Sequence, residues 1–150
     1  MTEPTWTHKG RMVTELQDIP EGTFGFIYQI THTPTNKRYI GKKVLYFTRK
    51  VKLTKTEIAE QTGPGRKPTT KLVAKESDWK TYYGSNKEFL SLTKIHPKEE
   101  FVKEILEFAS SKKMLTYYEC KYLFKYDAIE NNPLYYNDNI LGKFYRKDFL

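Results

Sequence analysis

One carboxylate in this sequence stands where an apolar side chain would be expected. Glu119 falls between Leu115 and Leu123 at the four-residue spacing of one helix face, about 200° around the helix from Lys121. A carboxylate that faces a protein core must be ion-paired, hydrogen-bonded or bound to a metal ion, because burying it bare costs several kcal/mol. An ion pair with a lysine or arginine is the simpler interpretation of the helix alone, and metal binding is the alternative.

Two tyrosines lie on a predicted β-hairpin. An aromatic and β-branched run at residues 24–31 is followed by a Thr-Pro-Thr-Asn-Lys turn and a shorter apolar run at residues 38–43. Tyr28 shares one face of the first strand with other large apolar side chains, so only its hydroxyl needs a polar partner. The second strand is expected to bring Tyr39 close to it.

Positive charge is concentrated in one segment of the chain. The net charge is +8, and residues 42–80 hold eleven basic against four acidic side chains, which leaves +7 there. This concentration predicts a surface for a polyanion, with nucleic acid favoured over a membrane. A solvated loop with spare lysines is the alternative. The side chains expected to contact phosphates are Lys42, Lys43, Lys50, Lys52, Lys55, Arg66 and Lys67.

A turn at Gly84 and Ser85 precedes a predicted helix over residues 86–95. Ser85 is the expected N-cap, and Glu88 three residues later would complete a capping box. The free backbone N–H groups at such a helix start suit a phosphate, so Ser85 is also a candidate for contact with nucleic acid. A cap without any ligand is the alternative.

The remaining elements complete an α+β pattern. Residues 101–108 predict a third strand beside the hairpin, and a second helix is expected to begin at Ser110 or Ser111 and to end near Ile129. A turn and a Tyr-Tyr-Asn sequence that contains Asn137 follow this helix. At 150 residues the chain fits one domain.

Three segments lie outside this pattern. Residues 1–23 are interpreted as a loosely structured arm, with an edge strand around residues 11–16 as the alternative. Residues 49–78 are interpreted as a basic insertion, which includes a short helix over residues 56–61. Residues 141–150 form a basic and aromatic tail with no assigned structure.

Composition excludes several classes of site. A single cysteine, Cys120, excludes an internal disulfide and a cysteine-based zinc site, and no cluster of serine, histidine and acid suggests a nucleophilic triad. No apolar stretch approaches the roughly 20 residues of a membrane span, and the first residues lack a signal-peptide pattern. We therefore expect a cytoplasmic protein.

The paired tyrosines resemble the signature of the GIY-YIG nuclease family. Ile27-Tyr28 and Tyr39-Ile40-Gly41 stand in place, whereas the first glycine of the family falls on Phe26, with Gly25 displaced by one position. The resemblance covers residues 24 to about 140 and is greatest to small phage-type members. It implies a small three-stranded antiparallel sheet flanked by helices, with the basic insertion after the hairpin.

The resemblance also implies a set of catalytic residues. Glu119 corresponds to a helix glutamate that binds one divalent ion, Mg²⁺ or Mn²⁺, and Asn137 to a downstream asparagine that orders the site. Tyr28 would accept the proton of the attacking water, and Tyr39 would position the water or the phosphate. Arg49, ten positions after Tyr39, corresponds to an arginine that clamps the phosphate.

Two positions depart from the family pattern. The insertion begins at Arg49, so Lys42 or Lys43 could share the role of the phosphate clamp. Several members use a histidine that has no counterpart between Arg49 and Tyr83. Lys80 is the candidate to replace it, and His96 is a weaker one because it precedes Pro97 at a predicted helix end.

These inferences predict a metal-dependent endonuclease that hydrolyses double-stranded DNA. A non-cleaving nucleic-acid-binding module on the same fold is the main alternative, with the tyrosines stacked on bases and Glu119 in an ion pair. A structural or protein-interaction domain is a third possibility. Cutting both strands with one active site per chain would favour a homo-oligomer or sequential nicking.

Overall fold

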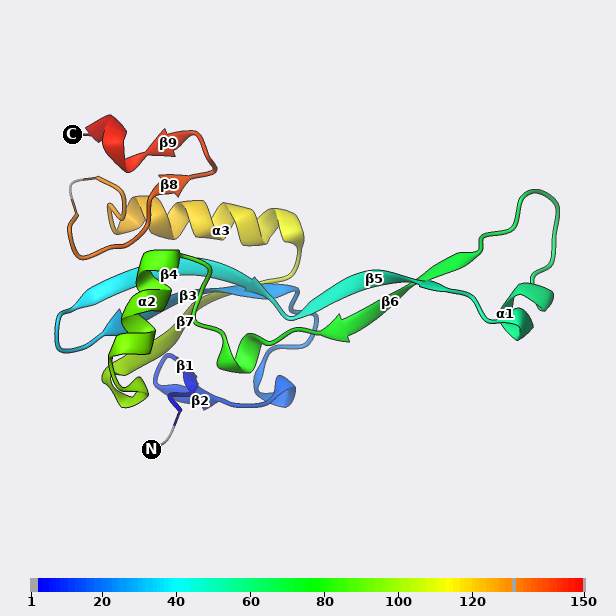
Figure 1. The fold of residues 1–150 in the computed structure, drawn as a ribbon, viewed down its shortest axis with the longest axis horizontal. Helices are drawn as coiled ribbons and strands as arrows, with labels where there is room; N and C mark the ends of the chain where they lie inside the picture. Colours follow the sequence, from blue (N-terminus) through cyan, green and yellow to red (C-terminus); the bar gives the residue numbers. More distant parts are fainter. Residues whose placement is uncertain (1–2, 131, 150) are drawn as a thin grey trace. The chain divides into compact units, whose positions relative to one another are not determined.

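The computed structural model describes residues 3–130 and 132–149, which form two compact units. The first unit comprises residues 1–45 and 78–150, and the second comprises Tyr46–Ser77. Figure 1 shows the chain with its elements labelled. The strands of the first unit are β1 (Trp6–His8), β2 (Arg11–Val13), β3 (Gly25–His32), β4 (Lys37–Val44), β7 (Phe101–Ala109), β8 (Asn139–Ile140) and β9 (Phe144–Tyr145). Its helices are η1 (Leu16–Asp18), η2 (Trp79–Thr81), α2 (Lys87–Ile95), η3 (Lys98–Glu100), α3 (Lys112–Lys125) and η4 (Arg146–Phe149).

The main sheet has five strands in the order β2-β1-β7-β3-β4. The α+β class is therefore confirmed, but the expectation of a three-stranded antiparallel sheet is wrong. The antiparallel trio β7-β3-β4 is present, and β1 extends it by pairing parallel to β7, while β2 pairs antiparallel to β1. The extension comes from strands of three residues each, which are too short to produce a clear alternation in sequence.

The arm expected over residues 1–23 contributes to the core. Trp6 on β1 is 1% exposed, and its indole Nε1 donates a hydrogen bond to the carbonyl of Trp79 at 2.6 Å. The Trp6 ring packs against Phe26 and Tyr28, with centroids 5.1 and 5.3 Å away. Only β2, at the sheet edge, matches the expected edge strand.

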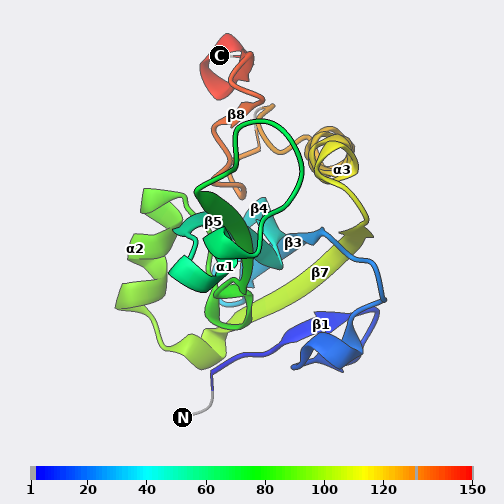
Figure 2. The same cartoon turned by 90° about the vertical axis from the view of Figure 1, so that its right-hand side faces the viewer.

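Both faces of the main sheet are covered, which explains why β3 is buried along almost its whole length. Phe26, Tyr28 and Ile30 pack with Phe89 of α2 on one face. Ile27 points to the other face and packs with residues of α3, including Leu115. The turned view shows α2 and α3 on opposite sides of the strands (Figure 2). The two helices can therefore bring side chains to β4 from opposite sides.

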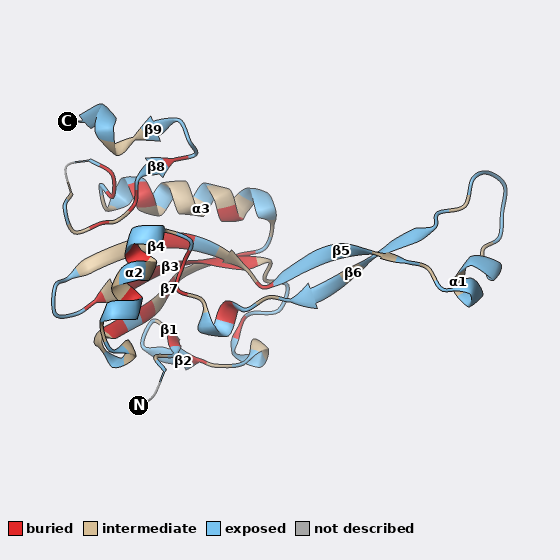
Figure 3. Ribbon diagram, in the orientation of Figure 1, coloured by how far each residue is buried: buried red, intermediate tan, exposed pale blue. Residues whose placement is uncertain are grey.

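The second unit is a two-stranded antiparallel ribbon. β5 (Tyr46–Lys52) pairs with β6 (Thr70–Glu76), and the short helix α1 (Lys55–Ala59) lies between them. Most ribbon residues are exposed, as the blue colour of β5 and β6 in Figure 3 indicates. Thr54 caps α1 in a capping box with Glu57. The expected short helix is thus present, although it begins and ends earlier than predicted.

Among the described residues, no helix is both long enough and apolar enough to cross a membrane.

Candidate active site

A hollow of about 480 Å³ lies beside β4, the edge strand of the main sheet. We call it the β4 hollow. Residues from four separate parts of the chain line it, and those used below are Tyr39, Lys42, Ser85, Glu119, Asn137 and Asp138. Since alternate residues of β4 point to opposite faces, Tyr39 lies on the α2 side and Lys42 on the α3 side. The edge of the sheet thus brings together groups that approach from both faces.

Tyr28 and Tyr39 are brought together as the hairpin predicts. Their ring centroids are 6.3 Å apart, and Tyr39 also stacks on Phe89 of α2 with centroids 5.9 Å apart. Tyr28 is 1% exposed. Burial raises the pKa of Tyr28 well above its usual value, and the neighbouring Tyr39 adds to the shift. Burial also raises the pKa of Tyr39, against an opposing hydrogen bond to Ser85.

Two glycines make room for these rings. Gly41 is directly opposite Tyr28 in the β3–β4 pairing, and a Cβ atom there would lie 2.3 Å from the Tyr28 hydroxyl oxygen. Gly84 has a φ of +99°, and a Cβ atom would lie 3.1 Å from both the Tyr28 hydroxyl and the Tyr39 ring. The position of the Tyr28 hydroxyl therefore depends on the absence of side chains at both positions.

Glu119 reaches the β4 hollow from α3. Its side chain is 22% exposed, and the Lys42 ammonium lies 3.7 Å from Oε1. Burial raises the pKa of Glu119, and the charge of Lys42 opposes this shift. The ion pair expected as the simpler interpretation is thus present, but it is loose and leaves the carboxylate facing a solvent-connected hollow.

Asn137 fixes the edge of β4. It is 5% exposed, and its side-chain amide makes two hydrogen bonds to Ile40, accepting from the backbone N–H at 2.9 Å and donating to the carbonyl at 2.7 Å. The amide therefore occupies the place of a neighbouring strand. With both groups engaged in this way, Asn137 is a positioning residue.

Replacing Asn137 with alanine should lower the free energy of unfolding by about 2–4 kcal/mol, because the buried N–H and C=O of Ile40 lose their partners. Urea denaturation of purified protein would measure the change. Asn139→Ala is the matched control, since Asn139 is exposed and only accepts a hydrogen bond from the Gly142 N–H. Equal midpoints for the two variants would contradict the role of Asn137.

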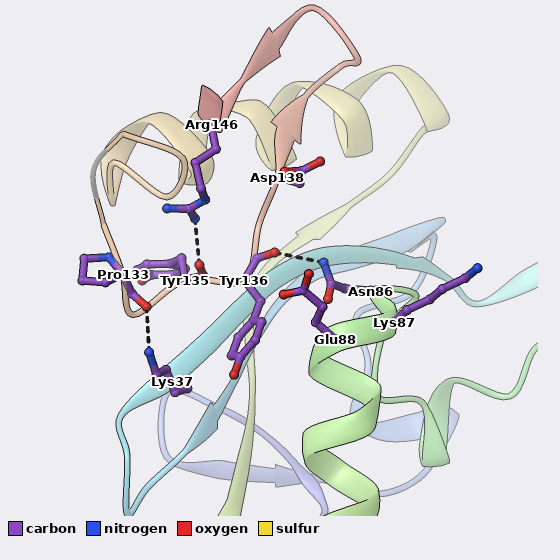
Figure 4. Close-up of a pocket in the computed structure, with 9 residues that line it drawn as sticks. All are labelled: Lys37, Asn86, Lys87, Glu88, Pro133, Tyr135, Tyr136, Asp138 and Arg146. Atoms are coloured by element: carbon purple, nitrogen blue, oxygen red, sulfur yellow. Dashed lines mark hydrogen bonds between the residues drawn. The ribbon is translucent and has the colours of Figure 1, made fainter. Parts of the chain in front are cut away.

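Arg146 is a residue that sequence analysis missed. Its guanidinium donates to the backbone carbonyls of Ala128, Asn132, Tyr135 and Asn137 at 2.7–3.1 Å. Figure 4 shows it beside Tyr135, in a second hollow that adjoins the first and shares Asn86 and Asp138 with it. Arg146 therefore holds the backbone of Asn137, and no local pattern in residues 141–150 reveals carbonyl partners that lie up to 18 residues away.

The predicted cap of α2 is wrong by one residue. Asn86, not Ser85, is the N-cap, and its side chain accepts a hydrogen bond from the Phe89 N–H at 2.9 Å. The Asn86 amide also donates to the carbonyl of Tyr136 at 2.9 Å (Figure 4). This second bond favours asparagine because a serine hydroxyl is too short to make both contacts. Ser85 is left exposed at the β4 hollow, within hydrogen-bonding distance of Tyr39.

The other predicted cations are not among the residues that line the β4 hollow. Lys43 is 2.6 Å from Asp78 and lies 3.8 Å over the Tyr82 ring. Lys80 of η2 pairs with Glu15 at 2.8 Å. Arg49 is exposed on β5 in the second unit. Of the candidates for the phosphate clamp, Lys42 is the one that lines the hollow.

His96 lies in a different cluster. It is the C-cap of α2, and its ring lies 4.3 Å from that of His32. Neither histidine lines the β4 hollow. His96, the weaker of the two candidates to replace the family histidine, is therefore not part of the β4 hollow.

Five of the predicted phosphate contacts lie in the second unit. Lys50, Lys52, Lys55 and Arg66 are exposed there, and Lys67 donates to the carbonyl of Gly63. The unit carries eight basic and three acidic side chains. The strands of this ribbon are mostly exposed, so the unit has little apolar core, and an isolated two-stranded hairpin is at best marginally stable in water.

The donor groups of the β4 hollow fit a single hard cation. Glu119 contributes a partly buried carboxylate with a raised pKa, and Asp138 and Asn139 also line the hollow with oxygen-bearing side chains. Mg²⁺ and Mn²⁺ prefer such oxygen donors and retain several waters, which a hollow of this size can hold. Asn137 also lines the hollow, but its buried amide is held by two hydrogen bonds to Ile40, so we assign it to positioning β4 rather than to the ligand set.

Comparison with known proteins identifies the family. Residues 6–140 match the family described as "Putative endonuclease segE, GIY-YIG domain". Searches of curated proteins and of solved structures found no match. The family match includes β1, which the motif comparison placed outside the domain, as well as the hairpin, α2, α3 and the segment carrying Asn137. Since the match spans nine-tenths of the chain, the protein belongs to the GIY-YIG nuclease family.

Proposed function

We propose that this chain is a divalent-metal-dependent endonuclease that hydrolyses phosphodiester bonds of double-stranded DNA. The observation that supports this most is the β4 hollow, where Tyr39, Lys42 and Glu119 converge with Tyr28 directly behind. Nucleases of this family generally depend on a metal ion. An ion such as Mg²⁺ or Mn²⁺, when bound at Glu119, would supply positive charge and Lewis acidity at a phosphate oxygen.

The cations of the chain would neutralise the phosphate. Lys42 lines the β4 hollow and lies 3.7 Å from Glu119, so it can contact a non-bridging oxygen while the carboxylate stays paired. Arg49 remains a proposed clamp, because a guanidinium matches the geometry of two phosphate oxygens. Removal of such charge stabilisation commonly costs about 10²- to 10³-fold in rate.

The two tyrosines would deprotonate and orient the attacking water. Because the pKa of Tyr28 is raised well above its usual value, its hydroxyl is protonated at neutral pH. Tyr28 can accept a proton from water only as the phenolate, so its own proton must first pass to solvent, which nearby positive charge favours by lowering its pKa; we assign it as the base in that state. Tyr39, hydrogen-bonded with Ser85 at the mouth, would orient the water or the phosphate.

Supercoiled plasmid tests this function. The purified protein with Mg²⁺ should convert plasmid to nicked or linear forms, and the same mixture with excess EDTA should leave it supercoiled. Cleavage that persists in EDTA would contradict metal dependence. Binding without cleavage under any divalent ion would favour the non-cleaving module, an alternative that the Lys42–Glu119 ion pair supports.

The exposed ribbon would hold the duplex through its phosphates. If about six phosphates are contacted, affinity for a DNA duplex should fall on the order of 10³-fold between 50 and 200 mM salt. Replacing both Lys50 and Lys52 with alanine should reduce the slope of log K against log salt by about 2. Fluorescence anisotropy with a labelled duplex would measure both effects.

The control for this prediction has the same change in charge. Lys94 and Lys121 are exposed on α2 and α3, so their double alanine variant removes two charges from outside the ribbon. An identical slope for the two double variants would show that charge, rather than the ribbon, determines DNA affinity.

A further inference from the structure

Three side chains at one end of β3 form a cluster that the proposed nuclease chemistry does not use. His32 ends β3, His96 caps α2, and Glu100 ends η3. One potential ligand atom from each residue lies within 4.8 Å of the others. None of the three lines the β4 hollow. We propose that this cluster is a second metal site, specific for Zn²⁺ or a similar borderline cation, which fastens β3, α2 and η3 together.

The distances are close to those of a zinc site. His32 Nε2 lies 2.8 Å and His96 Nδ1 lies 3.5 Å from Glu100 Oε1. Ligands bound to tetrahedral zinc at about 2.0–2.1 Å lie about 3.3 Å from one another. Zinc binding would require the Glu100 carboxylate to move about 0.5 Å from His32 Nε2 and His96 to turn slightly, and both side chains are partly exposed.

The environment of His32 is already suited to a metal ligand. Its ring is 1% exposed and packs on Phe101, with centroids 4.8 Å apart. The other ring nitrogen, Nδ1, lies 2.7 Å from the Thr35 hydroxyl. A hydroxyl both donates and accepts, so Thr35 can bond the tautomer whose Nε2–H faces Glu100 and also the tautomer whose Nε2 lone pair faces a cation. Metal-bound histidines almost always donate their second ring N–H in this way.

The backbone holds the acidic ligand in place before any ion binds. The carbonyl of Glu100 accepts hydrogen bonds from the Thr33 N–H at 2.9 Å and from the Thr33 hydroxyl at 3.0 Å, which join η3 to the end of β3. The backbone segments that carry His32 and Glu100 are therefore held beside each other, while the Glu100 side chain is free to adjust its distance to an ion. The side chains of His96 and Glu100 are 36% and 33% exposed, which leaves the outer side of the site open to water as a fourth ligand.

The donor set distinguishes this site from the one at Glu119. Two imidazoles and one carboxylate favour Zn²⁺, Co²⁺ or Ni²⁺, whereas Mg²⁺ prefers oxygen donors alone. The ion would join segments that are 64 residues apart in the chain, and it would stabilise the folded state by binding it in preference to the unfolded state.

Zinc titration of the chelator-treated protein tests the site. Isothermal calorimetry of the wild type should give one Zn²⁺ per chain, and His96→Gln should bind at least about 100-fold more weakly. Zinc at 100 times its dissociation constant should raise the melting temperature of the wild type by about 5–10 °C and leave that of His96→Gln unchanged. Glu119→Gln should bind zinc as the wild type does, which separates this site from the β4 hollow.

His8→Gln is the matched control. His8 is the remaining histidine, and its Nδ1 contacts the carbonyl of Ile105 at 2.9 Å, away from the cluster. It should bind zinc with wild-type affinity. Equal zinc affinity in His96→Gln and the wild type, or no stoichiometric binding by either, would overturn the proposal. Neither result bears on plasmid cleavage with Mg²⁺.

Discussion

Replacing Glu119 with glutamine is expected to lower plasmid cleavage by at least about 10³-fold while DNA affinity stays within about twofold. Glutamine keeps the shape of the side chain but removes the charge that would hold a divalent ion in the β4 hollow. The cleavage rate under saturating protein, measured at several Mg²⁺ concentrations, would give the effect. Partial recovery at high Mg²⁺ would indicate weakened ion binding.

The same variant should keep or increase its stability. Burial raises the pKa of Glu119, so the folded state binds this proton more tightly than the unfolded state does. Stability therefore falls as pH rises from the ordinary carboxyl pKa through the raised one, because the charged carboxylate is costly to bury. Glutamine carries no charge, so the variant avoids the free-energy cost of burying a carboxylate. Its melting temperature at pH 7 should therefore be unchanged or higher.

The exposed residue Glu21 offers a control for charge alone. Glu21→Gln removes one negative charge at a position that does not line the β4 hollow, and it should cleave plasmid at the wild-type rate. If Glu119→Gln also retains wild-type cleavage, Glu119 holds no catalytic ion and the proposed mechanism is wrong. If it loses cleavage only through unfolding, the melting temperature will show this directly.

Replacing Gly41 with alanine should have the second large effect. The added Cβ would lie 2.3 Å from the Tyr28 hydroxyl oxygen and 2.6 Å from Cζ, and Tyr28 cannot move freely because rings of Trp6, Tyr39 and Tyr82 surround it. We expect a loss of about 1–3 kcal/mol in unfolding free energy, which corresponds to several degrees in melting temperature. Cleavage should fall about 10²-fold, because the hydroxyl is displaced from its position.

Two further variants test whether contact with the Tyr28 ring causes the destabilisation in Gly41→Ala. Gly65→Ala places a Cβ in open space at a φ of +95°, so it measures the cost of backbone strain without a clash. In Gly41→Ala combined with Tyr28→Val, the smaller side chain should remove most of the added destabilisation, giving a strongly non-additive double-mutant cycle. Additive effects would mean that Gly41 is required for a reason other than the Tyr28 ring.

Local pattern predicted the parts of the site that lie on regular elements. The alternation along residues 24–31 placed Tyr28 in the core, and the hairpin brought Tyr39 to it. The four-residue spacing on α3 showed that Glu119 shares a helix face with Leu115 and Leu123, where an apolar side chain would be expected. These features depend on periodicity within one element or on a single turn, so the sequence contains them directly.

Features that depend on contacts between distant segments could not be predicted. The parallel pairing of β1 with β7 joins Trp6 to Lys103, and three-residue strands give no periodicity from which to infer it. The N-cap of α2 is Asn86 rather than Ser85 because the Asn86 amide also bonds the carbonyl of Tyr136, which lies 50 residues away in the chain. His96 could be recognised as a helix end, but its neighbour His32 could not be inferred from any local signal.

The segment that carries Asn137 also determines how copies of this chain can associate. β4 is a long edge strand, yet the outward groups of Arg38 and Ile40 are occupied, since Arg38 bonds Leu134 and Tyr136 and the amide of Asn137 bonds Ile40. The opposite edge, β2, has three residues. Neither edge offers a long template for strand addition, which protects the main sheet from edge-to-edge aggregation. A homo-oligomer that cuts both DNA strands would therefore assemble through surfaces other than the edges of this sheet.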